Sequence, residues 1–403
     1  MYRLILKMAW ENSFLRLSRT LLVIMMIAVS MSMMLGLQSL YDGMAANMID
    51  KNKRSASGDI SIFAKDYRID KDIKNIIPNA TTLKEDIKNL DGVDAVVLRL
   101  SADGLASTAR KSSFASIIGI NLEDEEKFGR FSEFLKNGEI NLSKHSAVIG
   151  IELAKTLKLR IGSKVVFSTQ DSSGDINSIS LRVRGVVQTT NILMDSNAVF
   201  VDIQSLYKFL SIDKTQATQI SIKSENRELC SALVQKYPSL DIKSFFELQP
   251  MMKMMQDMMI IINSITFFIV MLVVFIGILG VMYVSILDRV REFGIMLGIG
   301  MEYRYIRVQI ILESIIVGFT GYIFGAVFGA ILLLYLSNYG LNLSSFADAL
   351  EMWGYESIIY GTIKVSYFTT TFTAIITASL LSVWLPLRKI KKLNPVEVIK
   401  AEK

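Results

Sequence analysis

The sequence predicts an α-helical membrane protein with four transmembrane helices and a large α+β extracytoplasmic domain between helices 1 and 2. Four mostly apolar stretches each have the roughly 20 residues needed to cross a hydrocarbon core of about 30 Å. None contains Lys or Arg, and Glu313 is the only acid within one. A long stretch with charges of both signs separates the first two. The four stretches are 21–40, 258–287, 308–337 and 367–387.

Basic residues flank the spans mainly on one side, and Lys and Arg gather on the cytoplasmic side of membrane helices. They precede span 1, lie between spans 2 and 3, and follow span 4: Arg3, Lys7, Arg16, Arg19, Arg289, Arg291, Arg304, Arg307, Arg388, Lys389, Lys391 and Lys392. This pattern predicts a multi-pass protein of the inner (cytoplasmic) membrane with both N and C termini cytoplasmic. It also accounts for the formal charge of +6, so nucleic acid is not an expected partner.

The order of segments predicts the domain organisation. The first apolar run has about 20 residues, against 7–15 in a signal peptide, which favours an uncleaved anchor. Within the outer domain, 219–243 has the strand–helix–strand pattern of 59–98, which indicates a domain split by an insert. The predicted parts are 1–42 (amphipathic start plus helix 1), 43–250 (outer domain, with 43–116 and 214–250 paired around a β-rich insert at 117–213), 251–287 (helix 2), 288–307 (cytoplasmic segment), 308–387 (helices 3 and 4 with a short outer loop) and 388–403 (cytoplasmic tail).

Side chains for common catalytic chemistry are scarce. His145 and Cys230 are the only histidine and cysteine, so neither a His/Cys metal cluster nor an intrachain disulfide can form. No G-x-x-x-x-G-K-[ST] motif occurs, so the chain has no P-loop for ATP. The sequence therefore predicts a non-enzymatic protein without a metal or a cofactor, which binds, moves or transmits something.

The segment between spans 2 and 3 is the most informative. Val290, Phe293 and Leu297 form one apolar stripe of a short helix, and Gly298 and Gly300 allow a sharp reversal toward the membrane. Two interpretations fit this pattern. The segment is either an amphipathic linker resting on the bilayer surface or a docking helix for a cytoplasmic partner.

Arg289-Val-Arg-Glu-Phe-Gly294 resembles the R-x-R-E-[FI]-G turn of lipoprotein-releasing (LolC/LolE-like) ABC transporter permeases, which belong to the macrolide-exporter/FtsX-like mechanotransmission superfamily. Further matches follow in the same order along nearly the whole chain. They include Ser57-Gly-Asp-Ile-Ser-Ile62, Val148-Ile-Gly-Ile-Glu-Leu-Ala154, Arg184-Gly-Val-Val187 and Asn394-Pro-Val-Glu-Val-Ile-Lys400.

The resemblance implies a permease subunit that pairs with a second permease subunit, as a homo- or heterodimer, and docks a separate ABC ATPase, which carries ATP and Mg. It also implies a porter-like outer subdomain. The function implied first is release of lipoproteins from the inner membrane for transfer to the outer membrane, with a periplasmic carrier as a further possible partner. The alternatives are a macrolide- or peptide-efflux permease working with a periplasmic adaptor, and a tethered regulator of a cell-wall hydrolase, whose relatives have smaller outer domains.

Three groups of candidate site residues follow. The resemblance places ATPase coupling, with Phe293 in a groove of the ATPase and the charges at the rim, at Arg289, Val290, Arg291, Glu292, Phe293, Gly294, Leu297 and Gly298. A substrate path for acyl chains, in contact with membrane lipids, is predicted at Met33, Met34, Leu37, Tyr41, Met258, Ile262 and Ile265, where methionine suits irregular apolar partners. The alternative for these residues is ordinary lipid-facing side chains. Close helix packing, either within one subunit or between two, is predicted at Gly321, Gly325 and Gly329.

Overall fold

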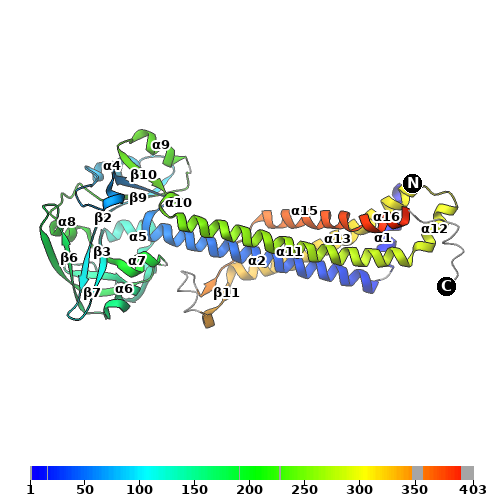
Figure 1. Ribbon diagram of the computed structural model, residues 1–403, viewed down its shortest axis with the longest axis horizontal. Helices are drawn as coiled ribbons and strands as arrows, with labels where there is room; N and C mark the ends of the chain where they lie inside the picture. The colour runs from blue at the N-terminus through cyan, green and yellow to red at the C-terminus, as the bar shows by residue number, and fades with distance from the viewer. Residues whose placement is uncertain (1, 16, 190, 227, 347–356, 392–403) are drawn as a thin grey trace. The chain divides into compact units, whose positions relative to one another are not determined.

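The computed structural model describes residues 2–15, 17–189, 191–226, 228–346 and 357–391, drawn as a ribbon in Figure 1. These residues form two compact units. The membrane unit contains residues up to 45, from 256 to 346 and from 357 on, and the sheet unit contains 46–255. Residues 347–356 of the predicted loop between spans 3 and 4, and the predicted tail from 392 on, lie outside the described residues.

The membrane unit is helical. Its helices are α1 (Tyr2–Phe14), α2 (Leu17–Asn52), α11 (Pro250–Asp288), α12 (Val290–Gly298), α13 (Tyr303–Asn338), α15 (Val365–Ser382) and α16 (Trp384–Lys391), with the short elements β11 (Leu341–Asn342), η3 (Ser344–Phe346) and β12 (Ile358–Ile359) between α13 and α15. Four segments are long and apolar enough to cross a membrane, as the sequence predicts: Leu17–Ser57, Pro250–Asp288, Tyr303–Asn338 and Val365–Arg388. Helices α2 and α11 have 36 and 39 residues, more than a bilayer requires, and both continue into the sheet unit.

Three glycines of α13 let α2 and α13 pack closely within this one chain. Gly321, Gly325 and Gly329 face Ile27, Met31 and Leu35 of α2 in that order. A Cβ atom at Gly321 would lie 2.9 Å from the Ile27 Cβ, and one at Gly325 would lie 2.9 Å from the Met31 Cβ. Both distances are shorter than normal contacts, so any larger residue would force the helices apart. The glycine face therefore serves packing within the subunit.

The sheet unit is built on a ten-stranded sheet with the order β10-β1-β9-β2-β3-β8-β5-β7-β4, in which β6 also pairs with β2 and β7. The strands are β1 (Ile60–Ala64), β2 (Val93–Ser107), β3 (Ser112–Ile120), β4 (Leu135–Gly138), β5 (Ser146–Gly150), β6 (Lys164–Gln170), β7 (Ile176–Val187), β8 (Ala198–Asp202), β9 (Gln219–Ser224) and β10 (Leu240–Ser244). The helices are η1 (Lys53–Ser57), α3 (Tyr67–Asp70), α4 (Ala80–Lys88), α5 (Leu122–Gly129), η2 (Phe131–Phe134), α6 (Ile151–Leu157), α7 (Ile192–Asn197), α8 (Ile203–Leu210), α9 (Leu229–Lys236) and α10 (Phe245–Leu248).

Two of the apolar cores of this unit share strand β2, and a third, smaller core contains Phe131, Phe134 and Phe200. The first part of β2 pairs with β9 and its second part pairs with β3. One core joins β1, β9 and β10 to α4 and α9, and the other joins β3, β5, β6, β7 and β8 to α6 and α8. Along the chain, the first of these cores gives way to the second within β2, near Leu98 and Leu100. The chain returns to the first core between Ile212 and Ala217.

Candidate functional site

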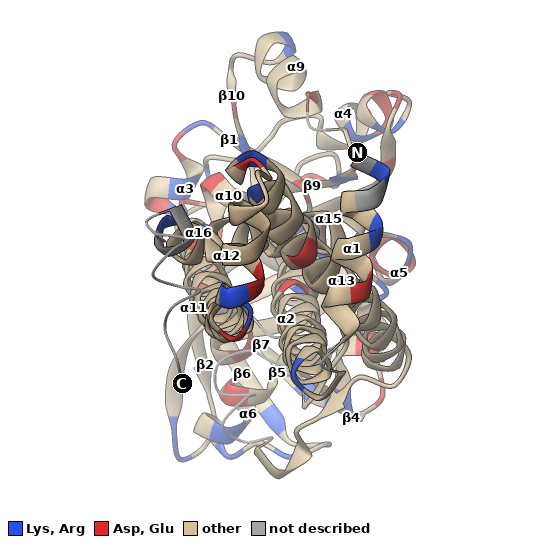
Figure 2. Ribbon diagram, turned by 90° about the vertical axis from the view of Figure 1, so that its right-hand side faces the viewer, with Lys and Arg blue, Asp and Glu red and all other residues tan. Residues whose placement is uncertain are grey.

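The cytoplasmic segment predicted at 288–307 forms a short helix between two long ones. Helix α11 ends at Asp288, Arg289 leaves the helical conformation with φ −111° and ψ 12°, and α12 ends at Gly298. Gly300 has φ +92°, a conformation that glycine adopts without strain, and α13 then begins at Tyr303. Figure 2 shows charged positions on α12 and at the ends of neighbouring helices.

Phe293 lies inside the chain's own core. Its side chain is 0% exposed and packs with Ile286 of α11 and Ile306 and Ile310 of α13. The predicted insertion of Phe293 into an ATPase groove is therefore corrected, because the ring already has its partners within the membrane unit. Arg289, predicted at the rim, is buried as well, and its guanidinium lies 5.1 Å from the centre of the Phe293 ring.

The opposite face of α12 is exposed. Arg291 and Glu292 project from it, and two large apolar side chains, Ile295 and Ile299, lie near its end. Ile299 is 78% exposed and Ile295 is 48% exposed, so this face carries uncovered apolar surface beside its charges. Val290 and Leu297 are half-buried, and Leu297 packs against the same core as Phe293. The apolar stripe thus holds α12 on its own subunit, and the surface left for a partner is the other face.

A buried ion pair fixes the start of α12 to α13. The Arg289 Nη1 atom lies 3.0 Å from both carboxylate oxygens of Glu313, which is 3% exposed. Gln309, one turn earlier, donates to Glu313 Oε1 at 3.1 Å, and Asn12 of α1 donates to the same oxygen at 3.2 Å. Arg289 Nε also bonds Glu292 at 3.0 Å. The Glu313 carboxylate thus has four donor contacts from three helices or helix ends.

A cavity of about 100 Å³ lies beside this pair. Its lining includes Asn12, Arg19, Thr20, Arg289 and Glu313. Apolar side chains, among them Ile278 and Val281, line the cavity as well, so the charged groups face a small space of mixed polarity. The two basic groups are neutralised by nearby acids, because Arg19 pairs with Asp288 as Arg289 pairs with Glu313.

Sequence reasoning did not assign a role to Glu313. The signal was present, because an ionisable residue inside a membrane span is costly and is retained for a partner or a function. Its partner could not be identified from the sequence, since the neighbouring turn offers several arginines and Arg289 lies 24 positions away.

The residues of the predicted substrate path fall into three groups by exposure. Met33 of α2 and Met258, Ile262 and Ile265 of α11 are exposed apolar side chains. Met34 is 0% exposed and belongs to the interior of the protein, which corrects its assignment to the path. Leu37 and Tyr41 are half-buried. Helix α11 also exposes further large apolar side chains along this part, including Ile261, Phe268 and Leu272.

In the sheet unit, burial raises the pKa of the Cys230 thiol. His145 lies in a turn with φ +62°. Across the part of the chain that the structure describes, no three His, Cys, Asp or Glu side chains come together as metal ligands.

Four spanning helices, a sheet unit inserted between the first two, and a short helix braced between spans 2 and 3 define a multi-pass membrane permease. The MacB-like periplasmic core domain matches residues 20–236, and the FtsX-like permease C-terminal domain matches residues 264–395. The chain belongs to this family of ABC transporter permeases.

Individual relatives agree with this assignment. The macrolide export ATP-binding/permease protein MacB 2 of Aeromonas hydrophila subsp. hydrophila is 23% identical over 100% of this chain and 61% of its own length. The lipoprotein-releasing system transmembrane protein LolC of Buchnera aphidicola subsp. Schizaphis graminum is 24% identical over 65% of this chain and 67% of its own. The chain thus spans about three fifths of the MacB relatives. The crystal structure of the periplasmic region of MacB from Actinobacillus actinomycetemcomitans matches 48% of this chain and 92% of its own, at 16% identity and a TM-score of 0.33.

Proposed function

We propose that this chain is a permease subunit that releases lipoproteins from the inner membrane, driven by a separate ATPase that docks on the exposed face of α12. The observation that carries the coupling part is the buried Arg289–Glu313 pair behind that face. A force applied to Arg291, Glu292 or Ile299 reaches α13 directly, because Arg289 joins the start of α12 to a residue inside the span. A helix held only by lipid contact would move without its neighbour.

The exposed face of α11 supports a lipid-like cargo. Met254, Met258, Ile262 and Ile265 lie on this helix with much of their surface uncovered. Methionine adapts to irregular apolar partners, and acyl chains of different length and saturation are such partners. The LolC relative supports the same cargo by its name. The macrolide-export relatives support a second candidate, a macrolide- or peptide-efflux permease that works with a periplasmic adaptor.

This function requires the sheet unit to lie on the outer side of the inner membrane and α12 to lie on the cytoplasmic side. In a Cys230→Ser background, cysteine at the exposed Ser173 should react with an impermeant maleimide added to intact cells, and cysteine at Ile299 should react only after the membrane is opened. The mass shift of the protein after labelling measures the reaction at each of the two cysteines. Labelling of Ile299→Cys in intact cells would reverse the topology and end the proposal.

Cargo release tests the proposed substrate. With the partner ATPase and ATP, the reconstituted complex should transfer lipoproteins from the membrane to a soluble acceptor, and Ile262→Asp should reduce that release by roughly tenfold while sparing assembly, because a charge beside hydrocarbon is costly. Ile260→Asp is the matched control, since Ile260 has similar exposure on the opposite side of α11.

If Ile262→Asp and Ile260→Asp reduce cargo release equally, Ile262 only faces bulk lipid. Absence of ATP-dependent release, combined with ATP-dependent efflux of a macrolide, would replace the proposed substrate by the second candidate.

A further inference from the structure

The end of α2 within the sheet unit has an unusual form. The helix passes into a π-helical turn, η1, in which Gly58 N bonds Lys53 O at 2.8 Å, five residues back. Gly58 then takes φ +66° and the chain enters strand β1. Short π-helical turns are rare and occur frequently at functional sites. The turn directly connects a membrane-spanning helix to the sheet.

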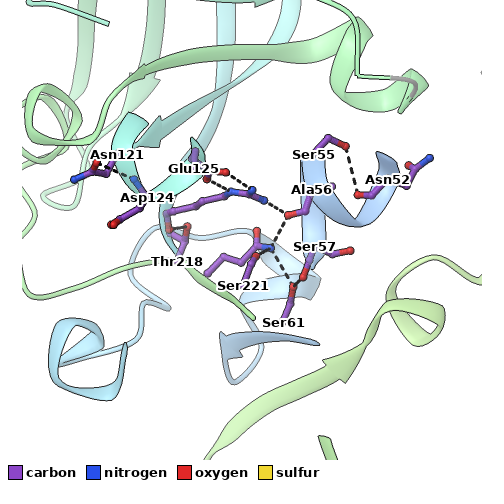
Figure 3. Close-up of polar contacts among 12 residues, drawn as sticks. Asn52, Ser55, Ala56, Ser57, Ser61, Asn121, Asp124, Glu125, Thr218 and Ser221 are labelled. Atoms are coloured by element: carbon purple, nitrogen blue, oxygen red, sulfur yellow. Dashed lines mark hydrogen bonds and ion pairs between the residues drawn. The ribbon is translucent and has the colours of Figure 1, made fainter. Parts of the chain in front are cut away.

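A single arginine of β2 holds this turn from inside the protein. Arg99 is 4% exposed, and its Nη1 atom donates to the carbonyl oxygen of Ala56 in η1 (Figure 3). Its other nitrogens form a two-point ion pair with Glu125 of α5, with Nε to Oε1 at 2.6 Å and Nη2 to Oε2 at 2.8 Å. Glu125 is 2% exposed, so the whole contact is out of water.

Arg99 lies at the point where strand β2 changes its pairing partner. Arg99 is the last residue of β2 that pairs with β9, and from Leu100 onward β2 pairs with β3. Arg99 thus lies between the two apolar cores that share strand β2. It connects the end of α2, the strand shared by both cores, and helix α5.

Two further groups brace the same turn. Gln219 of β9 donates to the Ala56 carbonyl at 3.2 Å and to Ser221 Oγ at 2.8 Å (Figure 3). On the outer side, Arg54 of η1 donates to the carbonyl of Gly129 at 2.8 Å and pairs with Glu133. The Arg54 guanidinium lowers the pKa of the Glu133 carboxyl, chiefly through its hydrogen bond to that carboxylate. The turn is therefore tied to both ends of the α5–η2 segment.

We propose that Arg99 is a positioning residue that makes α5 follow any displacement of the end of α2. A buried ion pair tolerates little change in geometry, because separating its members leaves desolvated charges. When η1 moves, Arg99 must keep both the Ala56 carbonyl and Glu125, so α5 moves with it. This inference rests on the proposed function only for the source of the movement, which is the ATPase.

The test compares two paired apolar replacements in the full chain assembled with its ATPase. R99M/E125L removes both charges together and keeps the side-chain volumes similar. K84M/D124L is the matched control, because Lys84 Nζ and Asp124 lie 2.6 Å apart and join α4 to the same helix α5 without touching η1. The measurement is amide hydrogen exchange of residues 53–58 and 122–129, without nucleotide and with a non-hydrolysable ATP analogue.

Without nucleotide, exchange at 53–58 is expected to rise about tenfold in R99M/E125L and to stay near wild type in K84M/D124L, since exchange reports local opening. With the analogue, the exchange change at 122–129 should be present in the wild type and the control but much smaller in R99M/E125L, in which only Arg54 still joins η1 to Gly129. If R99M/E125L does not assemble, Glu125→Gln, which removes the charge of the Arg99 partner and keeps its volume, should give a smaller rise at 53–58.

Unchanged exchange at 53–58 in R99M/E125L, or in Glu125→Gln where that variant decides, overturns the inference. A wild-type response at 122–129 that persists in R99M/E125L overturns it as well. Cargo release by the wild-type complex is measured separately, so loss of release in the wild type counts against the proposed function and not against the role of Arg99.

Discussion

Glu313→Leu is expected to destabilise the membrane unit by about 3–5 kcal/mol, because it removes the buried partner of the Arg289 cation and leaves only the exposed Glu292 beside it. Gln309 and Asn12 lose their acceptor in the same step. Glu313→Gln should be milder, since an amide oxygen still accepts hydrogen bonds. Thermal inactivation of the purified chain in detergent, followed by ATPase stimulation in the assembled complex, measures the effect.

The double variant Arg289→Met/Glu313→Leu separates the effect of the ion pair on stability from its effect on ATPase stimulation. Replacing a buried ion pair by apolar residues of similar volume is often neutral or stabilising, so much of the lost stability should return. ATPase stimulation should stay low, because the direct link between α12 and α13 is gone. Glu302→Leu is the control, since the Glu302–Arg304 pair is exposed and such pairs contribute about 0–1 kcal/mol. If Glu313→Leu melts like the wild type, the pair does not hold α12 in place.

Phe293→Ala should mainly reduce stability, whereas Ile299→Asp should mainly reduce ATPase binding. Phe293→Ala removes a fully buried ring and should cost about 3–5 kcal/mol of stability even in the isolated chain. Ile299→Asp should leave the melting temperature nearly unchanged but weaken ATPase binding, since an apolar anchor at an interface can contribute about 2 kcal/mol or more. Thermal melting and co-purification of the ATPase distinguish the two.

Arg304→Ala serves as the surface control for both variants, because its side chain is largely exposed and pairs only with nearby residues. Loss of ATPase binding by Phe293→Ala with an unchanged melting temperature would contradict the buried position of the ring. Normal ATPase binding by Ile299→Asp would exclude the end of α12 from the docking surface.

Local patterns were sufficient for the secondary structure. The apolar runs at 21–40 and 258–287 predicted spans, and α2 and α11 contain them. The strand–helix–strand patterns at 59–98 and 219–243 predicted β1, α4 and β2 and then β9, α9 and β10. Each of these signals depends on hydrophobicity and spacing within one element, which sequence displays directly. The extra length of α2 and α11 was not visible, because a polar helix beyond the bilayer has no comparable signal.

The sequence by itself determined the four spans, the inserted α+β unit and the short amphipathic helix between spans 2 and 3. Only the tertiary structure decided which partner each side chain has. The stripe containing Phe293 has the same period whether it packs on its own core or on another protein, and the structure places it on its own core. Met33 and Met34 are equally apolar, yet one is exposed and the other buried. The pairs Arg289–Glu313 and Arg99–Glu125 join residues 24 and 26 positions apart, and many other pairings were chemically equivalent. The physical reason is that burial and charge pairing depend on which elements meet in space, and the spacing of residues along one element carries no information about its neighbours.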